Sequence, residues 1–129
     1  MEWIWNFEDI EEGRFTRSRK LKPVELNREN GSGVFEGSEG TYTCTLTHCT
    51  CQDFQYRLHG AQPCKHILSL GAALKAYDPD AVARRFEAEE LKRCLAMAYG
   101  YYHLFHEPVL SNKDYDSMKA RLAKIQSME

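Results

Sequence analysis

The sequence predicts a mixed α+β protein, and three observations lead to that prediction. Residues 41–47 alternate apolar and β-branched side chains with a period of two, which is typical of a half-buried strand. Residues 79–106 and 111–128 repeat apolar side chains every three or four positions, which is typical of amphipathic helices. Cysteine and histidine side chains stand in two close pairs between these regions. We therefore expect a small β-hairpin or meander plus a helix, followed by an antiparallel helical hairpin.

Several short strands are expected before residue 41. The segments Arg14 to Lys20, Val24 to Leu26 and Val34 to Gly37 are predicted strands, and Asn30 to Gly33 is a turn by composition. Ser38 to Gly40 forms a tight connection, where glycine can adopt a positive φ.

Large aromatic side chains alternate at the amino terminus. Trp3, Trp5 and Phe7 are spaced like residues on one face of a strand, so they predict a short strand or an extended arm that packs on the domain.

Helix signals follow residue 64. A helix is predicted to begin near Lys65, after an irregular stretch from residue 52 to 63. Asp78 and Pro79 suit the cap and first position of the long helix 79–106. Ser111 and Asp114 form a capping box for the last helix. We divide the chain into an aromatic and acidic arm (1–12), a middle module (13–77) and a helical hairpin (79–129).

Charge is distributed unevenly along the 129 residues, whose net charge is −2. Residues 1–12 carry five acidic and no basic side chains, whereas residues 13–76 carry nine basic and five acidic ones. The amino terminus shows no basic region followed by an apolar run, and no stretch approaches the roughly 20 apolar residues of a membrane span. We therefore expect a cytoplasmic chain that has no membrane partner.

The two Cys/His pairs contain the donor set of a metal site. Cys49 and Cys51 form C-x-C, and Cys64 and His66 form C-x-H after a gap of twelve residues. Residues i and i+2 of an extended segment share a face, so Cys49 and Cys51 can both reach one ion. Cys64 and His66 complete the set, with His66 in the first turn of the predicted helix. Three thiolates and one imidazole complete a tetrahedral Zn²⁺ site and leave no position for a catalytic water. The pattern predicts one structural zinc ion and no enzymatic activity.

Buried or redox cysteines are the alternative interpretation. A C-x-C disulfide is strained, and a cytosolic chain disfavours disulfides. Four further residues are expected not to bind the metal: Cys44, His48, His59 and Cys94. For the two cysteines the reason is that free cysteine behaves as a small hydrophobic residue.

Residues from about 34 to 70 resemble the SWIM-type zinc finger family. The motifs that carry the resemblance are V-F-E-G-S (34–38), Y-T-C-T-L (42–46), C-T-C-Q-D-F (49–54) and P-C-K-H-I (63–67). The resemblance implies a zinc module of a β-hairpin and a helix, with Cys49, Cys51, Cys64 and His66 as ligands. It also implies interaction with DNA or protein partners in DNA-related processes.

Basic side chains gather before the first turn and near the cysteines. Arg14, Arg17, Arg19, Lys20 and Lys22 lie within nine residues, and Arg57 and Lys65 could extend the patch. Alternating residues of a strand would present these charges to nucleic-acid phosphates. The alternative is a solvated face balanced by the acidic arm.

Residues from about 90 to 129 resemble the N-terminal helical subdomain of bacterial NAD-dependent DNA ligases. The resemblance rests on the run from Ala98 to Glu129 and implies contacts to nicotinamide mononucleotide (NMN) from Tyr102, His103, Tyr115 and Asp116. Asn112 stands where that family usually has an acid, and no K-x-D-G motif is present. Together the two resemblances indicate a bacterial or phage source.

Two functions are therefore expected. The first is a non-enzymatic, zinc-binding interaction module that contacts DNA or a protein. The alternative is an accessory or sensor that binds NMN or NAD through the helical hairpin.

Overall fold

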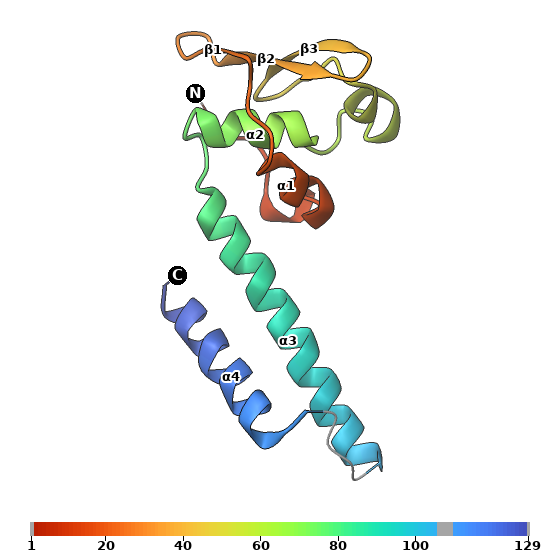
Figure 1. Ribbon diagram of the computed structural model, residues 1–129, viewed down its shortest axis with the longest axis vertical. Coiled ribbons are helices and arrows are strands. Elements are labelled where there is room, and N and C mark those ends of the chain that lie inside the picture. Colours follow the sequence, from red (N-terminus) through yellow and green to blue (C-terminus); the bar gives the residue numbers. More distant parts are fainter. Residues whose placement is uncertain (1, 106–109, 129) are drawn as a thin grey trace. The chain divides into compact units, whose positions relative to one another are not determined.

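Two compact units make up the chain, Met1–Pro79 and Asp80–Glu129. The computed structural model describes residues 2–105 and 110–128, apart from the side chains of Tyr102, His103 and Phe105. The elements in chain order are η1 (Phe7–Asp9), α1 (Glu12–Ser18), β1 (Glu25–Asn27), β2 (Ser32–Gly37), β3 (Gly40–Thr45), η2 (Asp53–Arg57), α2 (Lys65–Ala73), α3 (Pro79–Phe105) and α4 (Asn112–Ser127) (Figure 1). The predicted α+β class is confirmed.

The sheet is an antiparallel meander in the order β1-β2-β3. Phe35 pairs with Tyr42 and Gly33 pairs with Cys44, so the alternation read from residues 41–47 directs Cys44 and Leu46 inward. Gly37 and Gly40 close the β2–β3 hairpin, and Gly40 has a φ of 132°, which favours glycine. The predicted strands at residues 24–26 and 34–37 are thus found as β1 and β2, with small changes at their ends.

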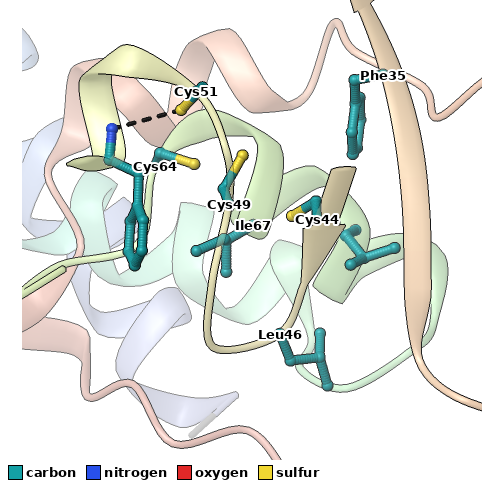
Figure 2. Close-up of a cluster of buried hydrophobic side chains, with 9 residues drawn as sticks. Phe35, Cys44, Leu46, Cys49, Cys51, Cys64 and Ile67 are labelled. Carbon is teal, nitrogen blue, oxygen red and sulfur yellow. Dashed lines mark hydrogen bonds between the residues drawn. The ribbon is translucent and has the colours of Figure 1, made fainter. Parts of the chain in front are cut away.

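The core of the first unit lies between this sheet and α2. Phe35, Cys44, Ile67 and Leu70 are at most 1% exposed and belong to one cluster (Figure 2). A Cβ atom at Gly33 would lie 2.8 Å from Leu70 Cδ1, so the helix contacts the strand where a side chain is absent. The close approach explains why a glycine stands in the interior of β2.

The amino-terminal arm packs on this core, but it is not a strand. The Trp3 ring stacks on Tyr77 with centroids 4.5 Å apart, and Trp5 Nε1 donates a 2.8 Å hydrogen bond to the Leu46 carbonyl. Tyr77 in turn donates to the Leu68 carbonyl, and burial raises the pKa of Tyr77 to about 12. Residues 2–6 belong to no strand, Asn6 has an extended backbone, and Phe7 begins the short helix η1.

The predicted strand from Arg14 to Lys20 is wrong, because residues 12–18 form helix α1. Phe15 and Ser18 are both 3% exposed, and this i, i+3 pair is the buried face of a helix. A strand would have placed residues 16, 18 and 20 on one face and would have buried Lys20. Phe15 is the only large apolar residue in this charged segment. One such residue cannot distinguish the 3.6-residue period of a helix from the two-residue period of a strand.

The second unit consists of α3 and α4, which pack as a hairpin. Ser111 caps α4 as predicted, since its Oγ accepts a hydrogen bond from the Asp114 N–H at 3.1 Å. Arg121 of α4 forms a bidentate ion pair with Glu87 of α3, at 2.7 and 3.0 Å. None of the described helices combines the length and apolar character needed to cross a bilayer.

Two helical glycines give opposite expectations for the same substitution. A Cβ atom at Gly71 of α2 would lie 2.5 Å from the Trp3 ring and 2.9 Å from Tyr77, whereas at Gly100 of α3 it would meet nothing within 4 Å. Gly71→Ala should lower the free energy of unfolding by about 1–2 kcal/mol, because overpacking outweighs the gain in helix propensity. Gly100→Ala should raise it by up to about 1 kcal/mol. Thermal unfolding followed by circular dichroism measures both changes, and stabilisation by Gly71→Ala would contradict this packing.

Candidate metal centre

The first pair of donors lies on a segment that folds back along β3. The Thr45 N–H donates to the His48 carbonyl at 2.8 Å, and the Thr50 N–H donates to the Thr43 carbonyl at 3.1 Å. These two bonds hold Cys49 opposite Cys44 in an isolated antiparallel bridge. The backbone turns immediately after the strand, which brings Cys49 and Cys51 into the core, at 0% and 3% exposure.

The second pair begins helix α2. Cys64 is the N-cap residue, with an extended backbone (φ −80°, ψ 174°), and His66 lies in the first turn. The N-terminal N–H groups of a helix carry a partial positive charge, which favours a negatively charged thiolate beside them. The helix start predicted near Lys65 is confirmed, and it directs Cys64 and His66 to the same cluster.

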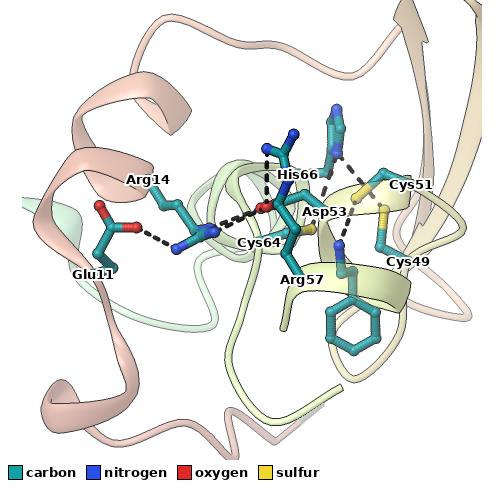
Figure 3. Close-up of polar contacts among 9 residues, drawn as sticks. Glu11, Arg14, Cys49, Cys51, Asp53, Arg57, Cys64 and His66 are labelled. Carbon is teal, nitrogen blue, oxygen red and sulfur yellow. Dashed lines mark hydrogen bonds and ion pairs between the residues drawn. The ribbon is translucent and has the colours of Figure 1, made fainter. Parts of the chain in front are cut away.

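The four side chains converge on a volume the size of one ion. One donor atom from each of Cys49, Cys51, Cys64 and His66 lies within 4.8 Å of the others (Figure 3). His66 Nδ1 is 3.7 Å from the Cys49 sulfur and 4.0 Å from the Cys64 sulfur. A tetrahedral zinc site has edges of about 3.5–3.8 Å, given Zn–S bonds of about 2.3 Å. Composition and spacing of the donors therefore fit one zinc ion.

Surrounding groups hold the donors and bury them. The Phe54 N–H donates to the Cys51 sulfur at 3.4 Å, and the Phe35 and Tyr42 rings lie 5.0 and 5.1 Å from the His66 ring. All four donor residues are buried, with His66 the most accessible at 5%. Such outer contacts fix the orientation of metal ligands.

The three buried thiols of the cluster cannot all ionise without a compensating positive charge. Hydrogen bonds from the Cys49 and Cys64 thiols lower the pKa of Cys51. The pKa of Cys64 is raised, first by its hydrogen bonds with Cys49 and Cys51 and then by burial. One thiolate is thus stabilised at the expense of its neighbours. Three thiolates can coexist in this buried space when a divalent ion supplies compensating charge.

An ion pair joins the metal-binding segment to α1. Arg14 Nε and Nη2 donate to the two carboxylate oxygens of Asp53, at 2.7 and 2.9 Å, and Arg14 also pairs with Glu11 (Figure 3). The Arg14 hydrogen bonds lower the pKa of Asp53, and the same bonds raise the pKa of Arg14. Asp53 stands two residues after Cys51, and its structural role was not predicted from the sequence. Its partner is 39 residues away, so no local pattern could have shown it.

The predicted nucleic-acid-binding residues occupy different environments. Arg14 is directed into the Asp53 ion pair, whereas Arg17, Lys20 and Arg57 are exposed and Lys65 is half-buried. Arg19 is exposed, but it donates to the Pro79 carbonyl at 3.2 Å and lies 5.6 Å from the Phe15 ring. Arg57 lies 3.8 Å from the Asp53 carboxylate. Phosphate contact by these residues stays a prediction.

The predicted nucleotide-binding residues lie on the second unit. Tyr115 is half-buried with Lys119 5.7 Å from its ring, and Asp116 is exposed on α4. The side chains of Tyr102 and His103 lie outside the described residues. NMN or NAD binding by this hairpin stays a prediction.

The comparison with protein families agrees with this geometry. A family model described as SWIM zinc finger matches residues 41–70, which include all four donors. The search of curated proteins and the search of solved structures found no match. The match supports a zinc-binding module in the first unit, and the resemblance of residues 90–129 to DNA ligases is not confirmed.

Arg14 and Arg57 contact the same carboxylate and provide a matched pair of substitutions. The side chain of Arg14 is 16% exposed and its hydrogen bonds are bidentate, whereas Arg57 is 79% exposed and 3.8 Å away. Arg14→Gln should lower the free energy of unfolding by about 2 kcal/mol, because the partly buried Asp53 carboxylate would lose both hydrogen bonds and keep only the distant, exposed Arg57. Arg57→Gln should change it by less than about 0.5 kcal/mol. Urea unfolding of the zinc-loaded protein measures both, and equal effects would contradict the structural role of the Arg14–Asp53 pair.

Proposed function

We propose that this chain is a non-enzymatic, zinc-stabilised interaction module whose basic segment, residues 17–22, contacts DNA phosphates. The observation that carries the proposal is the exposure of four cationic side chains within six residues. These are Arg17, Arg19, Lys20 and Lys22. Phosphate contacts from such side chains supply most of the affinity of sequence-independent DNA binding.

The helical form of residues 12–18 changes how this segment presents its charge. Arg17 and Lys20 are three residues apart across the end of α1 and the turn that follows it, where the Lys20 N–H donates to the Arg17 carbonyl at 3.2 Å. Side chains at this spacing lie on the same side of a helical turn. The basic side chains therefore project from the end of a helix and the turn that follows it, and not from one face of a strand as was expected.

The zinc centre would support this basic segment indirectly. Cys51 is one of the four candidate zinc donors, Asp53 follows in η2, and Asp53 accepts hydrogen bonds from Arg14 of α1. Four protein donors leave no open coordination position, so the metal supplies structure and not a reactive water. Zinc would thus fix the segment to which α1 is attached, and α1 would present the basic residues.

The salt dependence of DNA binding tests the proposal. The fluorescence anisotropy of a labelled duplex is measured at several salt concentrations with zinc-loaded protein. The Arg17→Ala/Lys20→Ala variant should bind more weakly and lower the salt slope by about 2, because each lost phosphate contact reduces the slope by about 1. Arg19 is left in place because it also contacts the Pro79 carbonyl.

A matched control removes two exposed lysines from the other unit. Lys92→Ala/Lys124→Ala makes a similar change in net charge and should leave both affinity and slope unchanged. Equal slopes for the wild-type protein and the Arg17→Ala/Lys20→Ala variant would contradict the proposed contact. Binding to an acidic polypeptide in the absence of DNA binding would indicate a protein partner instead.

A further inference from the structure

Cys44 is a buried thiol outside the group of four donors, and it lies directly opposite one of them. It is 0% exposed and forms an antiparallel bridge with Cys49, which is also 0% exposed (Figure 2). We propose that Cys44 is a redox partner of the metal centre: on oxidation it forms a disulfide with Cys49 and thereby releases zinc.

The backbone hydrogen bonds define the type of pair. The bonds from Thr45 N–H to the His48 carbonyl and from Thr50 N–H to the Thr43 carbonyl flank the two cysteines, which exchange none themselves. Cys44 and Cys49 are thus a non-hydrogen-bonded antiparallel pair, a class with Cα atoms about 4.5 Å apart and side chains on one face. Disulfides span Cα separations of about 4.4–6.8 Å. This pair can be bridged with little backbone movement.

The hydrogen bonds at the sulfurs distinguish Cys49 from the other two cysteine ligands. The Phe54 N–H donates to the Cys51 sulfur, and the Ile67 backbone hydrogen-bonds to Cys64. Among the described residues, the contacts of the Cys49 sulfur are with other thiols and with His66. A hydrogen bond from a backbone N–H stabilises a thiolate and thereby lowers its nucleophilicity. Cys49 therefore keeps the most nucleophilic sulfur, and it is the one that faces Cys44.

The reaction needs a two-electron oxidant, for which a peroxide suffices. The Cys49 thiolate attacks one peroxide oxygen, and the O–O bond breaks to give a sulfenic acid and hydroxide. The Cys44 sulfur then attacks the Cys49 sulfur, the S–O bond breaks, and the Cys44 proton leaves with the hydroxyl as water. Two cysteine sulfurs are oxidised and one peroxide is reduced. The disulfide removes Cys49 from the donor set, so Cys51, Cys64 and His66 would hold zinc more weakly and would release it.

Disulfide mapping on the unmodified chain tests this step. Zinc-loaded protein is treated with hydrogen peroxide, free thiols are alkylated under denaturing conditions, and zinc release is followed with a chromogenic chelator. Chymotryptic cleavage after Leu46 separates Cys44 from Cys49, and tandem mass spectrometry distinguishes Cys49 from Cys51. We expect a Cys44–Cys49 linkage that accumulates in step with zinc release, and recovery of the site after dithiothreitol and zinc are added.

Two variants give an independent readout. Cys44→Ala should release zinc several-fold more slowly at the same peroxide concentration, whereas Cys94→Ala should match the wild-type rate, because Cys94 lies on α3 outside the cluster. If Cys44→Ala fails to fold, the mapping on the wild-type chain still decides. Alkylation of Cys44 as a free thiol in the oxidised, zinc-free chain would overturn the proposal, and so would equal release rates for Cys44→Ala and wild type.

Discussion

The first unit depends on one cluster, in which three sulfurs and one imidazole from two separate segments come together. One segment ends the β-meander and the other begins α2, and the donor atoms of both lie within 4.8 Å of one another. The surrounding core is small, and Cys44, Cys49 and Cys64 form part of it as fully buried side chains. A unit of this size buries a limited apolar area, so a metal ion can contribute a large share of its folding free energy.

The rest of the first unit is arranged around that convergence. The Phe35 and Tyr42 rings flank the imidazole from the sheet, and Asp53 connects the metal-binding segment to α1 through Arg14. The Trp3 ring stacks on Tyr77, which in turn hydrogen-bonds to the backbone of α2. Each of these contacts positions an element relative to the segment that carries the donors. Of the exposed basic residues, Arg17 lies on α1 itself, and Arg19, Lys20 and Lys22 follow it directly in the chain.

The sequence predicted the features whose signal is local. The C-x-C and C-x-H pairs, the alternation at residues 41–47 and the capping serine at 111 are each complete within a few residues, and all appear in the structure. Helix α1 was mistaken for a strand because Phe15 and Ser18, its buried face, give too short a pattern to distinguish a period of two from 3.6. The Arg14–Asp53 ion pair and the Cys44–Cys49 bridge form only when the chain folds back on itself, so no local sequence pattern predicts either of them.

Hydrogen exchange with and without metal tests the central claim most directly. Amide exchange of the reduced full chain is measured by mass spectrometry after zinc is removed by a strong chelator and again after one equivalent is restored. The account predicts that the amides of β3 and α2 lose protection without zinc and regain it with one equivalent, because the ion joins these two elements. Unchanged protection of β3 and α2 in metal-free, reduced protein would contradict it.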